Sequence, residues 1–133
     1  MKFFQNIGDL FYKTVIYDDR YKYILEGLFN TIIIAFFAVI IGVIIGTIVA
    51  LIRNNYDQNQ KFKLLNHLCN LYVSIIRGTP VILQLMIIYY VIFKSVNIDI
   101  IIVSIIAFGI NSGAYVSEII RAGINSIPKG QSE

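Results

Sequence analysis

Apolar residues fill long stretches of this chain, and charged residues interrupt them only at intervals. The first stretch without an ionisable side chain lies between Glu26 and Arg53, and it exceeds the roughly 20 residues that a membrane-crossing helix needs. The second, 78–93, is shorter, so its helix must include apolar residues before Arg77. The third follows Asp99, whose carboxylate can cap the first free N–H groups of a helix. The pattern predicts transmembrane helices at about 27–52, 72–93 and 100–120.

The composition agrees with a membrane protein and excludes several other classes. Hydrophobic residues make up 57% of the chain and charged residues 14%, whereas a soluble domain carries about 25% charged residues. A chain of 133 residues cannot bury so much apolar surface in a core of its own. The single cysteine, Cys69, excludes an intramolecular disulfide and a cysteine metal cluster. We therefore expect an all-α, multi-pass membrane protein that contacts lipid and not nucleic acid, with no enzyme activity, metal or cofactor of its own.

The residues before the first span differ from the rest of the chain. Apolar side chains recur there at helical spacing with polar ones between them, at Phe3, Phe4, Ile7, Phe11 and Val15. Such a pattern is typical of an amphipathic helix in the membrane interface, and a frayed terminus is the alternative. We assign 1–25 to an outer amphipathic arm and 26–133 to the transmembrane domain.

The charges of the first loop bear on the orientation of the chain. Arg53, Lys61 and Lys63 outnumber Asp57 in this loop. Because basic residues concentrate in cytoplasmic loops, this favours a cytoplasmic first loop and an N-terminus outside the cell. The basic residues of the N-terminal arm oppose that orientation, so the charges alone decide it only weakly.

Small residues repeat at a spacing of four along two of the predicted spans. They are Ala38, Gly42, Gly46 and Ala50 in the first, and Gly109 and Gly113 in the third. Small side chains let helix backbones approach closely inside a membrane. The repeats predict helix–helix packing without naming the partner of either face.

A break in the helical pattern precedes the second charge-free stretch. Gly78 suits a left-handed residue at the end of a helix, Thr79 an N-cap, and Pro80 the first position of a new helix. Gln84, one turn later, is a polar group within the hydrocarbon and should face protein or water. Arg77 and Gln84 are interpreted either as a structural anchor and a helix–helix contact or as parts of a functional site.

The end of the chain carries a second set of polar residues. Glu118 and Arg121 share one face of the third span, and the helix should break at about Pro128, because a residue before proline avoids the α conformation. An ordinary ion pair between Glu118 and Arg121 at the interface is the structural alternative to a functional role.

Together these segments resemble a known family. EGLFNT is followed by RGTPVILQ with a later YY, and then by AYVSEIIRAGINSIPKGQSE. This order, over 26–133, is similar to the permease subunit of bacterial type I ABC importers for polar amino acids. The resemblance implies the first three spans of a five-helix permease core in the bacterial cell membrane, with its N-terminus outside. It also implies ABC ATPase subunits, an extracytoplasmic amino-acid-binding protein and a second permease chain, either identical or a sister chain.

The resemblance also implies a contact with the ATPase. In this family a Glu-Ala-Ala coupling helix follows the PKGQ segment, and Glu133 matches the first residue of that helix. The resemblance therefore implies that the ATPase-coupling segment starts with Pro128, Lys129, Gly130, Gln131 and Glu133. We expect the sequence to be the front part of a longer permease, because the coupling helix and two further spans of the family would follow this point. The chain contains no Walker A motif, so ATP hydrolysis would belong to separate subunits.

Polarity and position single out two groups of residues for the transport role. We expect the substrate path to include Gln84, Asn111 and Ser112. Polar contacts of a gate, or contacts that are only structural, are expected at Arg77, Thr79, Pro80, Glu118 and Arg121. A small three-span pore or interaction protein is the alternative function, and an ABC permease for another small polar solute is a third.

Overall fold

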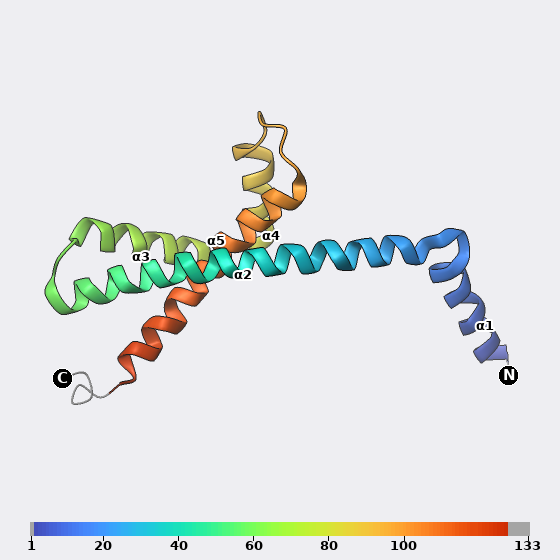
Figure 1. Cartoon of the computed structure of the whole chain (residues 1–133), viewed down its shortest axis with the longest axis horizontal. Coiled ribbons are helices and arrows are strands. Elements are labelled where there is room, and N and C mark those ends of the chain that lie inside the picture. The colour runs from blue at the N-terminus through green and yellow to red at the C-terminus, as the bar shows by residue number, and fades with distance from the viewer. Residues whose placement is uncertain (1, 128–133) are drawn as a thin grey trace. The chain divides into compact units, whose positions relative to one another are not determined.

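The structure, a computed structural model, describes residues 2–127, which form helices and the turns between them (Figure 1). The α-helices are α1 (Lys2–Phe11), α2 (Arg20–Asn59), α3 (Lys63–Gly78), α4 (Val81–Ile87) and α5 (Ile100–Asn125). A π-helical turn, Tyr12–Ile16, and a 3₁₀ turn, Tyr17–Asp19, follow α1, and a second π-helical turn, Ile88–Ile92, follows α4.

The chain divides into two compact units, 1–33 and 34–133. In the first unit the predicted N-terminal helix is present as α1, and its exposed apolar side chains include Phe3, Phe4, Ile7, Leu10 and Phe11. The position of this helix in the membrane interface stays a prediction.

Among the described residues, two helices are long and apolar enough to cross a membrane, α2 with 40 residues and α5 with 26. The first and third predicted spans lie inside them. The predicted cap of the third span is also confirmed, because the Asp99 carboxylate accepts a hydrogen bond of 2.7 Å from the backbone N–H of Ile101. α2 continues past its last apolar residues as far as Asn59, so its end extends beyond the charge-free stretch.

The small residues of α2 face those of α5, which confirms the predicted packing and identifies the partner. Every member of both repeats is buried. A Cβ atom added to Gly42 would lie 2.6 Å from Ser112 Oγ, and one added to Gly46 would lie 2.7 Å from Val116 Cβ. Because the residue numbers rise together along the contact, α2 and α5 run in the same direction.

α3 returns beside the last turns of α2 (Figure 1). Val49 of α2 meets Cys69 and Val73 of α3 and Ala114 of α5 in a small buried cluster. The Tyr72 hydroxyl donates a hydrogen bond of 2.6 Å to the backbone oxygen of Ile110, which joins α3 to α5. These contacts hold the three helices together at the level of the cluster.

The second predicted span, 72–93, is not one straight helix. α3 and the helical segment 81–92 meet at an angle of 110° across a short break. The break falls in the predicted segment, but its details differ from the expectation. Gly78 is the last residue of α3 and has no positive φ, Thr79 is the extended residue that ends α3, and Pro80 is the N-cap of α4 and not its first residue. The end of α3 is capped instead by the Gln84 side chain, which donates to backbone oxygens there.

Candidate functional site

Gln84 closes the bend between α3 and α4. Its amide nitrogen lies within hydrogen-bond distance of three acceptors, which share its two hydrogens: the backbone oxygen of Ile76 at 2.7 Å, the backbone oxygen of Thr79 at 3.0 Å and the Thr79 hydroxyl at 2.8 Å. Ile76 and Thr79 lie at the end of α3, where backbone carbonyls lack partners within the helix. The Thr79 hydroxyl in turn donates to the backbone oxygen of Ile75 at 2.8 Å. A side chain from α4 therefore caps the preceding helix and holds the angle between the two.

The same glutamine connects the bend to α5. Asn111 donates from its side-chain nitrogen to Gln84 Oε1 at 3.1 Å. Gln84 is buried, with 8% of its surface exposed, and both ends of its amide have partners. This satisfies a polar group that lipid could not satisfy. The prediction that Gln84 faces protein or water is confirmed, and the neighbour is protein.

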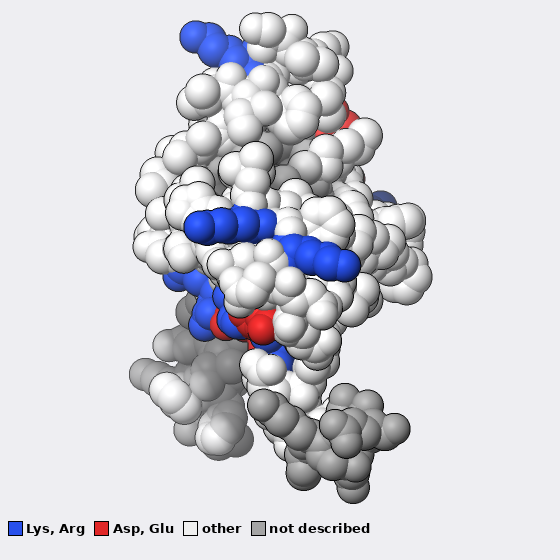
Figure 2. Space-filling view, turned by 90° about the vertical axis from the view of Figure 1, so that its left-hand side faces the viewer, with Lys and Arg blue, Asp and Glu red and all other residues white. Residues whose placement is uncertain are grey.

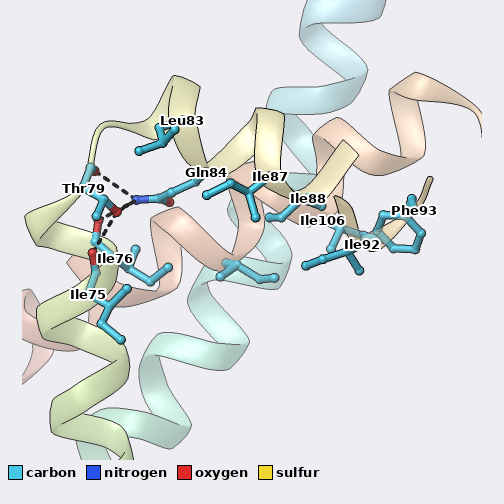
Figure 3. Close-up of a pocket in the computed structure, with 11 residues that line it drawn as sticks. Ile75, Ile76, Thr79, Leu83, Gln84, Ile87, Ile88, Ile92, Phe93 and Ile106 are labelled. Carbon is cyan, nitrogen blue, oxygen red and sulfur yellow. Dashed lines mark hydrogen bonds between the residues drawn. The ribbon is translucent and has the colours of Figure 1, made fainter. Parts of the chain in front are cut away.

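A pocket of about 500 Å³ lies beside this network, between the α3–α4 bend and α5. Figure 3 shows Gln84 and Thr79 at one end of it and isoleucine side chains along the rest. The pocket is lined by Ile75, Ile76, Thr79, Leu83, Gln84, Ile87, Ile88, Ile92, Phe93, Ile106 and Ile110. No charged side chain lines it, so it offers the charged ends of a free amino acid nothing to pair with.

The three residues predicted for the substrate path lie in two environments. Gln84 and Asn111 form one hydrogen-bonded pair. Ser112 instead lies against Gly42, in the contact between α2 and α5. A path role for any of them stays a prediction.

Glu118 forms ion pairs with arginines of two other helices. One of its carboxylate oxygens pairs with Arg53 of α2, and the other lies 3.2 Å from Arg77 Nη1 at the end of α3. Only 9% of the Arg53 side chain is exposed, whereas 31% of the Glu118 side chain is. The Arg77 guanidinium also lies over the ring of Tyr115, one turn before Glu118 on α5, at 5.6 Å from its centre. Such a stack adds a cation–π attraction to the ion pair.

Arg121 makes a third ion pair between helices, with α2. Its Nη2 atom lies 2.6 Å from Asp57 Oδ2 near the end of α2. Glu118 and Arg121 thus both pair outside α5, and within residues 2–127 no ion pair joins them to each other. The alternative of a local pair on one helix face is wrong, because partners on α2 and α3 lie closer.

Sequence reasoning placed Arg53 and Asp57 in a loop and missed their role. α2 extends through both residues, so they lie on the helix that packs against α5. A lone arginine just past an apolar span is an ordinary interfacial signal, and nothing in the sequence pattern names its partner 65 residues away. Figure 2 views the molecule from the side of the α2–α3 turn and shows a patch where blue and red side chains intermix.

We name these residues the charge cluster: Arg53, Asp57, Arg77, Glu118 and Arg121. Its ion pairs join α2, α3 and α5, in addition to the apolar contacts of the buried cluster around Val49. The residues predicted to begin the ATPase-coupling segment, Pro128 to Glu133, lie outside the described residues, and α5 is the helix that precedes them in the chain.

Comparison with known proteins gives consistent matches. Residues 42–133 match the family described as binding-protein-dependent transport system inner membrane component. GlnP of Rickettsia prowazekii (strain Madrid E), which is named for a glutamine transport system, is 42% identical over 88% of this chain. The arginine transport system permease protein ArtQ of Bacillus subtilis (strain 168) is 42% identical over 84%, and the L-cystine transport system permease protein TcyB of the same organism is 44% identical over 80%.

The chain spans about half the length of these relatives: 52% of GlnP, 49% of ArtQ and 44% of TcyB. A crystal structure of an amino acid ABC transporter with histidines is similar over 78% of this chain and 46% of the other, with a TM-score of 0.67 and 35% identity. The family match covers well over half of the sequence and includes α3, α4, α5 and the whole charge cluster. The chain therefore belongs to the binding-protein-dependent transport system inner membrane components.

Proposed function

We propose that this chain is part of the permease subunit of an ATP-driven importer for polar amino acids in the bacterial cell membrane. The observation that carries the proposal is the similarity of its helical arrangement to an amino acid ABC transporter at 35% sequence identity. The relatives named for glutamine, arginine and cystine systems support the same substrate class. Separate ATPase subunits, an extracytoplasmic amino-acid-binding protein and a second permease chain would complete the importer.

The charge cluster would serve as a connection between the ATPase side and the rest of the permease. α5 leads toward the segment 128–133, which resembles the start of the ATPase-coupling segment. A movement of α5 would act on α2 through Arg53 and on the end of α3 through Arg77, since Glu118 pairs with both. Arg77, Thr79 and Pro80 lie at the bend, so the same movement would reach α4.

The polar network at the bend is the proposed part of the substrate path. Gln84 and Asn111 come from helices on either side of the pocket. Their amides already pair with each other and with the end of α3, so a substrate would have to exchange hydrogen bonds with them. Ser112 would enter a path only if α2 and α5 separate, because it lies in their contact.

Uptake of labelled amino acids tests the proposal. Membrane vesicles that contain the native permease and its partner subunits should take up glutamine, arginine or cystine only when ATP and the binding protein are both supplied. The intact mass of the native gene product should be measured in the same membranes, because the relatives are about twice as long as this chain. Uptake that needs neither ATP nor a binding protein would contradict the importer and support a pore.

Gln84→Leu separates a role in the path from a capping role alone. A role in the path predicts a raised KM for uptake in protein that still folds, and Asn111→Ala should raise it as well. A capping role alone predicts less folded protein with an unchanged KM, because the carbonyls at the end of α3 lose their donor. Ile82→Leu, at an exposed apolar position of α4, is the matched control and should change neither quantity. Unchanged uptake and unchanged folding in Gln84→Leu would contradict both roles.

A further inference from the structure

The turn between α2 and α3 presents an aromatic side chain between two lysines. Phe62 is 66% exposed, and Lys61 and Lys63 on either side of it are exposed as well. Phe62 has a φ of 60° and is the N-cap of α3, but no side-chain hydrogen bond caps that helix. A left-handed conformation is unfavourable for a bulky residue, and the N-cap position favours Ser, Thr, Asp or Asn. Phe62 thus weakens the fold in two ways without packing in the core.

An exposed apolar stripe continues from Phe62 along α3. Its members follow at helical spacing, and each is at least half exposed: Leu64, Leu68, Leu71 and Ile75. Cys69 and Val73 lie on the other side of the helix, in the cluster with Val49. The residues of α3 before Cys69 therefore lie beside the part of α2 that follows Val49, where the charge-free stretch ends. An apolar stripe at that level lies where acyl chains meet headgroups.

The lysines of the turn are available for an outside partner. Within residues 2–127 no carboxylate lies within ion-pair distance of Lys61 or Lys63, and Asp57, the nearest acid along the chain, is paired with Arg121. In Figure 2 blue side chains extend across the near end of the molecule, apart from the patch where blue and red intermix. The turn therefore combines uncompensated positive charge with exposed apolar surface.

We propose that the α2–α3 turn, 60–64, binds anionic phospholipid. Phe62 and Leu64 insert among the acyl chains at the membrane surface, and Lys61 and Lys63 pair with the lipid phosphates. Attraction of basic side chains to an anionic leaflet acts together with apolar insertion, and each strengthens the other. The inserted state would offset the unfavourable conformation of Phe62. The proposal rests on the membrane location of the chain and not on amino-acid transport.

Fluorescence of a tryptophan placed at the turn tests this directly. The chain has no tryptophan, so Phe62→Trp introduces a single tryptophan, whose emission can be excited apart from that of the tyrosines. The variant is reconstituted in vesicles of brominated phosphatidylcholine, with or without brominated phosphatidylglycerol. Phosphatidylglycerol should shift the emission to shorter wavelength and increase its quenching. Each lysine should raise the ratio of inserted to free turn roughly fivefold, so the double variant Lys61→Gln with Lys63→Gln should lower this ratio about twenty-five-fold.

Two controls make the outcome decisive. Phe36→Trp, at an exposed position in the charge-free stretch of α2, should be quenched equally in both kinds of vesicle and reports that the chain has inserted. Lys94→Gln, added to Phe62→Trp, removes an exposed charge elsewhere and should leave the quenching unchanged. Equal quenching of the Phe62→Trp variant with and without phosphatidylglycerol would overturn the proposal. Long-wavelength, unquenched emission in both kinds of vesicle would also overturn it, because the turn would then lie outside the lipid, where it could bind a protein instead.

Discussion

Glu118 is the residue on which the charge cluster depends, because it neutralises a buried arginine. Arg53 has 7% of its surface exposed, and its Nε atom has no hydrogen-bond partner within residues 2–127. Glu118 is the carboxylate that pairs with it, and Glu118 also pairs with Arg77. Arg121 Nε also has no partner within the described residues, but Asp57 and Arg121 are 43% and 29% exposed, so water screens this pair more than it screens the 9%-exposed side chain of Arg53. The Glu118–Arg53 pair and the Arg121–Asp57 pair should therefore differ in their contribution to stability.

Glu118→Gln should lower the free energy of unfolding by about 2–3 kcal/mol. Removing one partner of a buried pair leaves a buried charge uncompensated, which costs about 3–5 kcal/mol, and the partial exposure of Glu118 reduces that figure. Asp57→Asn should lower it by no more than about 1 kcal/mol, as is usual for exposed pairs. Denaturant unfolding of the chain in detergent micelles measures both, and equal effects would contradict this ranking.

The double variant Arg53→Met with Glu118→Leu tests whether the loss comes from the unpaired charge. Replacing a buried ion pair by apolar residues of similar volume is often neutral or stabilising. The double variant should therefore unfold at a higher denaturant concentration than Glu118→Gln. If it is less stable than the single variant, the packing of the arginine side chain matters more than its charge.

At the scale of helices, the contact between α2 and α5 depends on the absence of side chains. A Cβ atom at Gly46 would lie 2.7 Å from Val116 Cβ and 2.9 Å from the backbone oxygen of Gly113. Gly46→Ala should destabilise the chain by about 1–3 kcal/mol through overpacking, less about 1 kcal/mol of gained helix propensity. Gly123→Ala is the matched control, because a Cβ atom there meets nothing within 4 Å, and it should be neutral or stabilising. Thermal unfolding measures the stability of both variants. An equal rise in unfolding temperature in Gly46→Ala and Gly123→Ala would contradict the close contact at Gly46.

The sequence predicted these two helices well because their signals are local. The charge-free stretch of α2 exceeds a membrane span, and Asp99 marks the start of α5 one residue before the helix begins. The spacing of the small residues in α2 also predicted a packing face, and the structure confirms it because each of them is buried. These features depend on spacing along a single helix, which the sequence contains in full.

The bend and the charge cluster depend on contacts between helices, and the sequence predicted them less well. Pro80 and Gly78 indicated a break, but the angle of 110° depends on Gln84 reaching back to the end of α3. The pairing of Glu118 with Arg53 joins residues that are far apart in the chain. The local pattern identified Gln84 and Glu118 as unusual polar residues. Their partners lie on other helices and are known only from the structure.

At the scale of the whole molecule, the direction of the helices limits the membrane topology. α2 and α5 run in the same direction, so if both cross the membrane, the segment between them must return to the side on which α2 began. α3, α4 and the turn that follows must therefore make a crossing despite their bend. A re-entrant loop, which returns to its own side, would require α5 to run opposite to α2.

Cysteine labelling tests this topology. In a Cys69→Ala background, single cysteines are placed at exposed positions by Asn59→Cys, Ser95→Cys and Ser126→Cys. The predicted orientation, with the N-terminus outside, also puts the start of α5 outside, so Ser95→Cys should react in intact cells with a maleimide that does not cross membranes. Asn59→Cys and Ser126→Cys should react only after permeabilisation, since the Arg121–Asp57 pair joins the end of α5 to the end of α2. Labelling of Asn59→Cys and Ser95→Cys on one side would indicate a re-entrant bend, and labelling with the sides exchanged would place the N-terminus in the cytoplasm.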